Sequence, residues 1–483
     1  MVSGAARMWV QGATLESVRT PAWLGVDVGT SSLKVIAVGA DGSPLAEQET
    51  AWALDRPDPQ TAEADTGVWL RAVDDLLIPM SETYDVRAVG VTGQMHGTIL
   101  VDESGSAVRP AVLWPDSRAE VMRPDWDALS DEVLGRLGNP WSAGMTGPVL
   151  AWLVENEPDV VARAERVALP KDLVREHLVP GSTTSDPSDA SGTLLWDVAK
   201  GSWSREATAL VPAHLLPRIR PSVEFVGTWR DAEVVVGGGD TPVSLVALEH
   251  AVDSWQPGDV VVNLGTGAQV IDPRTGPPTG FGWSDAHVYE GVLGDHYSMV
   301  AAQNAGLALS WAKNQLGISW DELSVICRHA PPGAGGVLFS PFVAPERGAL
   351  SPTRSGPGWI SEEVGEHPPT TLAARAAAEA QAFLVRRCWE LLDVDAGRVF
   401  VLGGGARESW TRQLLADVLG KPVHHLPMRS VSAAGAVILA GGPAPREGHS
   451  PSARAEPKEH SVLRDAYQRW CAEMYDGGLP GLP

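Results

Sequence analysis

Three kinds of feature are scarce in this chain of 483 residues, and each scarcity excludes a class of protein. No stretch approaches about eighteen uninterrupted apolar residues, so we expect no membrane-spanning helix. The formal net charge is −23 and no basic cluster occurs, which argues against a nucleic-acid partner. The three cysteines, Cys327, Cys388 and Cys471, have no metal-ligand spacing.

The two ends of the chain differ from its body. Residues 1–22 lack the basic segment and apolar run of a secretory signal peptide, so we interpret them as a flexible N-terminal extension. Without a secretion signal, we expect the cysteines to be buried, reduced thiols of a cytoplasmic protein. Residues 443–483 are interpreted as a Pro-rich linker and a terminal helix, whose helically spaced apolar positions are Val462, Leu463, Ala466, Tyr467 and Trp470.

The most informative segment present is 25–36, where apolar runs flank a polar turn and predict a β-hairpin. Glycine lets the backbone approach a ligand closely, and successive N–H groups with hydroxyls form a concavity suited to phosphate oxygens. An aspartate at the entrance to the turn could hold Mg²⁺. The alternative is an ordinary hairpin with a polar turn. The residues concerned are Asp27, Gly29, Thr30, Ser31 and Lys34.

Three further apolar runs, at 234–236, 260–264 and 399–402, each lead into a glycine-rich turn. Each run is typical of a buried strand that ends in a loop which a bulky side chain would block. None of the turns fits the dinucleotide fingerprint, and the chain contains no P-loop. The sequence therefore predicts a phosphate site that is assembled from several separate turns.

The order of these turns, with the motifs at 93–97 and 114–118 between them, resembles the FGGY carbohydrate kinases, and among them most closely the xylulokinases. The motifs at 171–172 and 185–193 strengthen the resemblance, which extends from about Trp23 to about Gly442. It implies an α/β fold of two ribonuclease-H-like domains of the actin and hexokinase type. Mixed sheets would be flanked by helices, with the active site in the interdomain cleft.

We expect the first domain at residues 23–246, where it would bind sugar and carry the catalytic base, and the ATP-binding domain at residues 247–442. Substrates would close the cleft between them, with a hinge near 244–250. Whether the protein forms a homodimer is left undecided, because the sequence does not determine the oligomeric state.

Asp240 closes the Gly-Gly-Gly turn that follows the run at 234–236. This places it at the carboxyl end of a strand, where open α/β sheets bind ligands. Phosphoryl transfer needs a carboxylate that accepts the proton of the acceptor hydroxyl. Asp240 could instead begin a helix, since Thr241-Pro242 is typical of a helix start, and the two roles are compatible. The resemblance assigns the general base to this position.

The resemblance also assigns binding roles. Asp27 would hold Mg²⁺ beside the phosphates and take part in catalysis. The sugar would contact Met95, His96, Trp114, Asp116 and Thr241. ATP would contact Gly29, Thr30, Ser31 and Lys34; Gly265, Thr266 and Gly267; Gly306 and Ser310; and Gly403, Gly404, Gly405 and Ala406. Each glycine could alternatively serve only a tight turn.

Three residues depart from the xylulokinase pattern: Thr241 replaces an asparagine, Pro115 stands between Trp114 and Asp116, and Val149 replaces a lysine. Loss of polar groups near the sugar changes which substrate is selected more than it changes the reaction that is catalysed. ATP-dependent phosphorylation of D-xylulose to D-xylulose 5-phosphate is the leading hypothesis. The second is a kinase for ribulose, sedoheptulose or an alditol. A non-catalytic sugar sensor is the third, but it predicts damage to Asp27 or Asp240, and both are intact.

Overall fold

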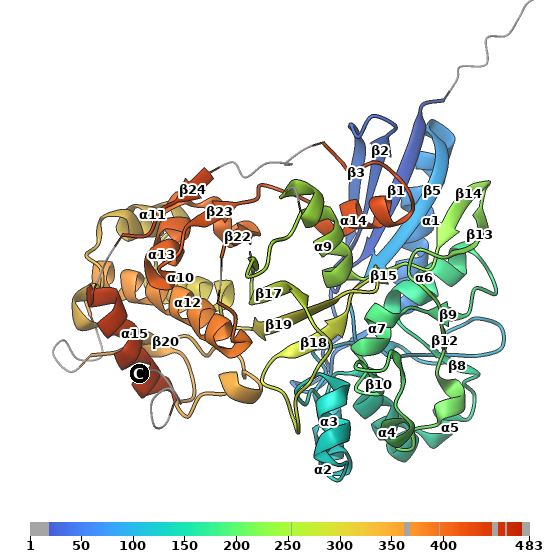
Figure 1. Cartoon of the computed structure of the whole chain (residues 1–483), viewed down its shortest axis with the longest axis horizontal. Coiled ribbons are helices and arrows are strands. Elements are labelled where there is room, and N and C mark those ends of the chain that lie inside the picture. Colours follow the sequence, from blue (N-terminus) through green and yellow to red (C-terminus); the bar gives the residue numbers. More distant parts are fainter. Residues whose placement is uncertain are drawn as a thin grey trace, which may run out of the picture.

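A computed structural model describes residues 19–252, 254–361, 368–395, 397–446, 453–458 and 461–475. The predicted N-terminal extension lies outside the described residues up to position 18, and the first strand begins at Pro21. Figure 1 shows two halves, each with its own sheet and covering helices. Within the described part of the chain, no helix is long and apolar enough to cross a membrane.

The first half is organised around a seven-stranded mixed sheet with the order β13-β14-β5-β1-β2-β3, in which β15 also pairs with β5. The pairing of β1 with β2 is antiparallel and places Asp27 opposite Lys34, which confirms the predicted hairpin. Strands β14, β15 and β1 all run parallel to β5, so their carboxyl ends meet at one edge of the sheet. The strands are β1 (Pro21–Val28), β2 (Ser32–Gly39), β3 (Pro44–Ala51), β5 (Asp85–Gly93), β13 (Phe225–Trp229), β14 (Ala232–Val235) and β15 (Gly238–Gly239).

The second half contains another seven-stranded mixed sheet, with the order β18-β19-β17-β16-β22-β23-β24. Strands β16 and β22 are parallel neighbours, so the glycine turns that follow them lie at the same edge. Strand β24 belongs to the segment predicted as a linker, and its pairing with β23 ties that segment to the sheet. The strands are β16 (Val260–Leu264), β17 (Ala268–Thr275), β18 (His287–Glu290), β19 (His296–Ala302), β22 (Val399–Leu402), β23 (Val423–His425) and β24 (Ala453–Ala455).

Helices cover both sheets and bury their apolar faces against them. In the first half, α1 packs on β2 and β5 through side chains such as Trp69, whose ring is fully buried. In the second half, α12 packs on β17 and β19 and, together with α10, α11, α13 and α15, encloses the larger core. These helices are α1 (Thr66–Thr83), α10 (Gly306–Gln315), α11 (Trp320–His329), α12 (Thr370–Leu392), α13 (Ser409–Leu419) and α15 (Ser461–Met474).

A region of short elements lies between β5 and β13 in the sequence and forms the lower part of the first half in Figure 1. Its helices are α2 (Arg123–Asp127), α3 (Asp131–Leu137), α4 (Thr146–Asn156), α5 (Pro158–Val161), α6 (Pro170–Leu178), α7 (Pro187–Ser191) and α8 (Arg205–Thr208). Short strand pairs connect parts of this region with one another and with β4, which precedes it in the sequence. The pairs are β4 (Glu63–Ala64) with β7 (Ala111–Val112), β6 (Ile99–Val101) with β8 (Arg166–Ala168), β9 (Thr184–Ser185) with β12 (Arg218–Ile219), and β10 (Trp196–Asp197) with β11 (Ser202–Trp203). In the second half, β20 (Leu338–Ser340) pairs with β21 (Gly358–Ile360).

The predicted terminal helix is present as α15. The apolar positions expected to pack on the body of the protein are buried, with one exception. Leu463, Ala466, Tyr467 and Trp470 are buried in the core of the second half, but Val462 is 51% exposed. Val462 precedes the core-facing residue Leu463 on the helix, so it lies on the outer side. All three cysteines are buried and free, as predicted.

Helix α14 (Val431–Leu439) comes from the segment expected to belong to the second domain, yet it packs on β1, β5 and α9 (Asp240–Ala251) of the first half (Figure 1). The approach is very close: a Cβ atom on Gly25 would lie 2.0 Å from the carbonyl oxygen of Ala433. One on Gly90 would lie 1.9 Å from the carbonyl oxygen of Ala436. Glycine at these two strand positions therefore lets the helix lie against the sheet.

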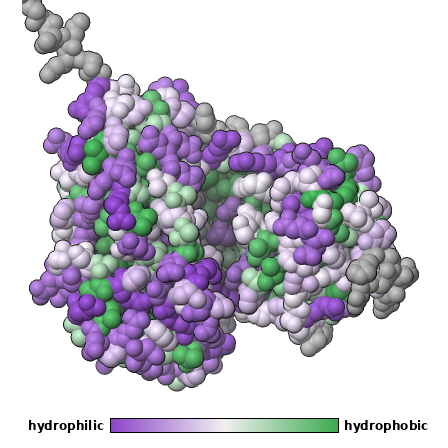
Figure 2. Space-filling model, turned by 180° about the vertical axis from the view of Figure 1, so that it is seen from behind, coloured by the Kyte–Doolittle hydropathy of each residue, from purple (hydrophilic) through white to green (hydrophobic). Residues whose placement is uncertain are grey.

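The expected domain boundary after residue 246 and the expected hinge at 244–250 both fall inside α9, which is a continuous helix. A hinge usually occupies loop or element-terminal residues that can absorb large backbone changes. Residues 254–259, before β16, form no helix or strand and have that character in this structure. Figure 2 shows the groove that separates the two halves on the surface.

Candidate active site

A cavity of about 530 Å³ lies between the two halves and is lined by residues from both. The segments that follow β5 and β15 line it from the first half, and the turn between β16 and β17 lines it from the second half. Of the predicted site residues, nine line it: Thr30, Met95, His96, Trp114, Asp240, Thr241, Gly265, Thr266 and Gly267.

Asp240 is the first residue of α9 and directly follows β15. The turn before it needs glycine at Gly237, whose φ is +83° and where a Cβ atom would lie 2.1 Å from the carbonyl oxygen of Val91. The carboxylate of Asp240 accepts a hydrogen bond of 2.7 Å from the backbone N–H of Thr241. Burial, reinforced by the negative charge of Asp27, raises the pKa of Asp240 to about 7. A carboxylate with such a pKa can accept a proton near neutral pH.

Asp27 lies near the end of β1, beside β5. Its Oδ2 accepts a hydrogen bond of 2.8 Å from the hydroxyl of Ser432, which α14 brings to the site. Its Oδ1 is buried and has no hydrogen-bond partner, and burial raises the pKa of the carboxyl group. A buried oxygen without a donor suits a cation such as Mg²⁺, which binds through one or two carboxylates together with substrate phosphates. Among the described residues, no group of three or more His, Cys, Asp and Glu forms a metal cluster.

The turn between β1 and β2 is closed by a hydrogen bond of 2.9 Å from the N–H of Gly29 to the carbonyl oxygen of Ser32. The hydroxyl of Thr30 donates to Gln94 over 3.1 Å and accepts from the indole N–H of Trp114 over 3.0 Å. These bonds tie the turn to the wall of the cavity. Ser31 is exposed, and the Nζ of Lys34 lies 3.9 Å from Glu49 on the adjacent strand β3; neither residue lines the cavity.

The glycine turns of the second half lie against one another. The N–H of Gly306, at the start of α10, donates to the carbonyl oxygen of Gly265 over 3.2 Å. Gly403 also packs closely on this region, because a Cβ atom there would lie 2.5 Å from the carbonyl oxygen of Leu264. Gly306 therefore contacts the turn at 265–267, and Gly403 and Gly405 lie close to Leu264 just before it. None of the predicted residues Gly306, Ser310, Gly403, Gly404, Gly405 and Ala406 lines the cavity itself.

His96 and Met95 extend from the end of β5 into the cavity. The Nδ1 atom of His96 lies 2.7 Å from the carbonyl oxygen of Gly192, so this nitrogen must be the protonated one. Burial, helped by the charge of Arg347, lowers the pKa of His96 to about 4. The ring is therefore neutral at pH 7, and its Nε2 atom is left as an acceptor. The hydroxyl of Tyr297 lies 3.6 Å from the sulfur of Met95.

Asp116 differs from the other residues that were predicted to contact the sugar, because it is fully buried and does not line the cavity. One of its oxygens accepts from the N–H of Ala62 over 2.8 Å, and the Nη2 of Arg118 donates to the same oxygen over 2.8 Å. The other oxygen accepts from the backbone N–H and the Nε of Arg118, each over 3.0 Å. Asp116 therefore anchors the segment that follows Trp114, and its role at the sugar is at most indirect.

Several lining residues escaped sequence reasoning because they belong to no recognised motif. Among the described residues that line the cavity, Arg347 is the one arginine or lysine. It comes from the second half and reaches the first, where its Nη1 donates to the hydroxyl of Ser142 over 2.9 Å. The others include His287 and Tyr289 on β18, whose rings stack at a centroid distance of 5.2 Å. A contact between positions 142 and 347 has no local signal in the sequence.

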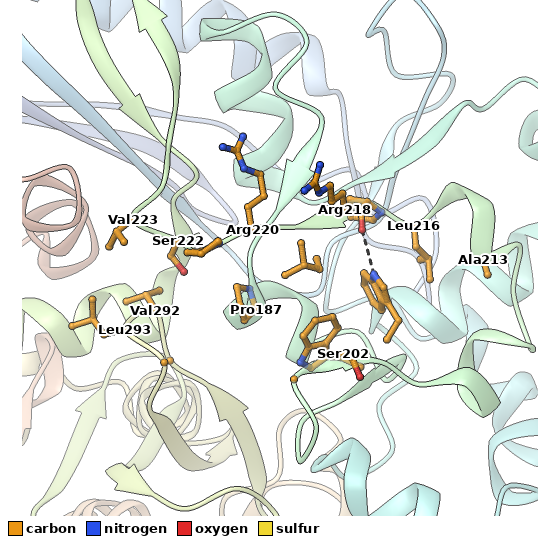
Figure 3. A pocket seen from close by; sticks show the side chains of 18 residues that line it. Pro187, Ser202, Ala213, Leu216, Arg218, Arg220, Ser222, Val223, Val292 and Leu293 are labelled. Atoms are coloured by element: carbon orange, nitrogen blue, oxygen red, sulfur yellow. Dashed lines mark hydrogen bonds between the residues drawn. The ribbon is translucent and has the colours of Figure 1, made fainter.

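A second hollow, of about 860 Å³, is larger than the first. In Figure 3, Ser222 lies beside Val292 and Leu293 on the left of the hollow, whereas Leu216 and Ala213 lie on the right. None of the predicted site residues lines this hollow. The site is therefore the 530 Å³ cavity, where the aspartate, the histidine and the glycine turn meet.

The protein has two α/β halves with a cavity between them, and glycine turns and carboxylates at strand ends lie around that cavity. This arrangement defines the class of the actin- and hexokinase-like kinases. Comparison with known proteins places the chain within this class. The N-terminal domain of the FGGY family of carbohydrate kinases matches residues 22–252, and the C-terminal domain matches residues 260–442. The chain belongs to the FGGY family of carbohydrate kinases. It is therefore a sugar kinase, which transfers phosphate to an alcohol group, and its family uses ATP.

Individual relatives agree with this assignment. The xylulose kinase of Escherichia coli K12 is 30% identical over 426 residues, which cover 83% of this chain and 86% of that protein. The structure of a "xyloylose kinase" from Brucella ovis matches with a TM-score of 0.81 and 26% identity, over 93% of this chain and 98% of that chain. A gluconate kinase from Lactobacillus acidophilus shares the fold with a TM-score of 0.83 at 18% identity, over 94% and 97% of the two chains. The fold alone thus does not identify the sugar.

Proposed function

We propose that this protein phosphorylates a ketose with ATP, that D-xylulose is its substrate, and that D-xylulose 5-phosphate is its product. The observation that carries the proposal is that Asp240, Thr30 and the turn at 265–267 line one cavity between the two halves, with the charge of Asp27 acting on Asp240 from outside its lining. The identity with xylulose kinases over most of the chain supports the choice of sugar.

Asp240 is proposed as the general base. Its carboxylate lines the cavity, and a pKa of about 7 makes it half ionised at neutral pH. The backbone N–H of Thr241 holds one oxygen in place, which leaves the other free to accept the proton of the sugar hydroxyl. As the proton leaves, the hydroxyl oxygen attacks the γ-phosphoryl group in line, and ADP is the leaving group.

Asp27 is proposed to hold Mg²⁺ through its Oδ1 atom, because that oxygen is buried and has no partner in the protein. The ion, when bound, neutralises charge on the phosphates. Ser432 keeps the other oxygen engaged and so fixes the direction of the carboxylate. From the side of the first half, the turn at 29–31 would meet the phosphates through Thr30, which lines the cavity, and Lys34, which lies beside Glu49 outside the lining, would add a positive charge at longer range.

The second half is proposed to bind the nucleotide. The turn at 265–267 lines the same cavity as Asp240, and such a glycine turn is suited to phosphate oxygens. Residues 403–406 lie behind it, where the absence of side chains would let the adenosine rest on the backbone. Gly306 and Ser310 on α10 would border the same site. The proposed domains are accordingly a sugar-binding first half and an ATP-binding second half, joined near residues 254–259.

The sugar is proposed to lie between Met95, His96, Trp114 and Thr241. The neutral Nε2 of His96 would accept a hydrogen bond from a sugar hydroxyl, and the sulfur-bearing chain of Met95 would pack on its carbon skeleton. Thr241 offers a hydroxyl where many xylulokinases have an amide. This difference favours keeping a second candidate, a kinase for another ketose or an alditol.

The test is a coupled assay of ADP release over a panel of pentuloses, heptuloses and alditols, with gluconate included. We expect D-xylulose to give the highest kcat/KM. A higher value for ribulose, sedoheptulose or an alditol would identify the second candidate. If no acceptor stimulated ADP release above the rate without sugar, the proposal would be wrong.

A further inference from the structure

Two sequence motifs, at 171–172 and 185–193, marked the family without receiving a role, and the structure shows that they form one buried cluster. Lys171, on α6, is fully buried. Its Nζ lies 2.6 Å from a carboxylate oxygen of Asp172, 3.0 Å from one of Asp186 and 3.1 Å from one of Asp189. The cluster lies beneath the turn that precedes Asp240, because Gly237 is close to the side chain of Lys171.

Opposite charges meet in this cluster. Lys171 contacts the carboxylates of Asp172 and Asp186, and the Nη1 of Arg175 lies 2.7 Å from Asp172. Burial raises the pKa of Asp189 well above its usual range. Because a buried charge without a partner is strongly destabilising, these buried ion pairs hold their members in one arrangement.

A hydroxyl connects the cluster to the residue directly before Asp240. Ser188, on α7, is fully buried, and its Oγ donates a hydrogen bond of 2.6 Å to Asp186. The same Oγ accepts a hydrogen bond of 3.0 Å from the backbone N–H of Gly239, the residue before Asp240. On the other side of the turn, the hydroxyl of Thr92 donates to the carbonyl oxygen of Gly238 over 2.8 Å.

We propose that Ser188 is a positioning residue for phosphoryl transfer: held by Asp186 and Lys171, its hydroxyl fixes the amide of Gly239 and so the place of the Asp240 carboxylate. A serine hydroxyl can do this because it donates one hydrogen bond and accepts others at the same time. The inference rests on the proposed role of Asp240 as general base. Displacement of a catalytic group by about 1 Å can cost roughly 100-fold in rate, so a loosened turn should be detectable.

The test compares wild-type enzyme with Ser188→Ala in two rates, ADP release with the best sugar acceptor and ADP release without sugar. Their ratio does not depend on how much of the protein is folded, since both rates scale with the folded fraction. It therefore separates positioning from simple destabilisation. We expect the ratio to fall by about tenfold to 100-fold in Ser188→Ala. Ser188→Cys, which keeps a weak donor and acceptor at the same place, should give an intermediate ratio.

Ser222→Ala is the matched control. Ser222 is 2% exposed, and its hydroxyl donates to the same oxygen of Asp186 over 2.7 Å. Ser222 contacts the turn through its backbone carbonyl, which accepts from the N–H of Gly237 over 2.9 Å and is kept in the variant, whereas its hydroxyl makes no hydrogen bond to residues 237–240 in the structure. Figure 3 shows Ser222 on the wall of the second hollow. Its ratio should stay within about twofold of wild type.

Two results would overturn the inference: an unchanged ratio in Ser188→Ala, or an equal fall in Ser222→Ala. A wild-type enzyme that no sugar stimulates would instead refute the proposed function itself.

Discussion

Replacement of Asp240 by asparagine is the sharpest test of the site. The amide keeps the shape of the carboxylate but cannot accept a proton. Loss of a general base typically lowers kcat by about 10²–10⁴-fold, which corresponds to roughly 3–5 kcal/mol of transition-state stabilisation. In the wild type, kcat should rise with pH through about 7, as Asp240 ionises. In Asp240→Asn, this rise should disappear.

The same structure predicts that the variant folds well. The pKa of Asp240 is raised from 3.8 to about 7 by burial and by the charge of Asp27. The folded state therefore binds more protons than the unfolded state between these values, and its stability falls as pH rises through this window. At pH 8 the ionised carboxylate opposes folding by up to about 4 kcal/mol. Asp240→Asn removes that charge, so its melting temperature at pH 8 should equal or exceed that of the wild type.

The assay is coupled ADP release at saturating ATP from pH 5.5 to 9, together with thermal melting at pH 8. Asp272→Asn is the control, because Asp272 is an aspartate on β17 whose pKa is also raised by burial but which lies outside the cavity. Its kcat should be close to wild type. If Asp240→Asn kept more than about a tenth of the wild-type kcat, the assignment of the base would be refuted.

Four further outcomes are expected. Asp27→Ala should raise the Mg²⁺ concentration needed for half-maximal activity and lower turnover, since it removes the unpartnered Oδ1 atom; an unchanged Mg²⁺ titration would mean that Asp27 only shapes the turn. Arg347→Ala should raise KM for the sugar by about 10-fold to 100-fold, because Arg347 lines the cavity and loss of a hydrogen bond from a charged group typically costs about 1.5–3 kcal/mol, and it should lower the melting temperature, because its bond to Ser142 is lost as well; equal KM values would place the sugar elsewhere. Gly90→Ala should lower the melting temperature sharply because its methyl group would meet the carbonyl of Ala436, whereas Gly276→Ala, with open space around it, should not; similar melting of both would contradict the close helix approach. Sugar and a non-hydrolysable ATP analogue together should shrink the radius of gyration in small-angle scattering, and constant dimensions would argue against closure.

The amino-acid sequence determined the chemistry of the site, because that chemistry depends on local patterns. An apolar strand followed by a glycine turn places its next side chain at the end of the strand wherever the strand lies in the fold. For this reason the hairpin at 25–36 and the presence of Asp240 and His96 in the cavity could be predicted from short segments. The burial of the cysteines followed in the same way from composition and context.

The tertiary structure decided everything that depends on contacts between distant segments. Helix α14 returns to the first sheet because glycines at positions 25 and 90 leave room for it, and neither glycine indicates a partner some 340 residues or more away. Arg347 meets Ser142 for a similar reason. The pKa of Asp240 near 7 arises only when burial and Asp27 act on it together. Local sequence thus specified several of the groups that line the cavity, whereas packing set their neighbours, their pKa values and their orientation.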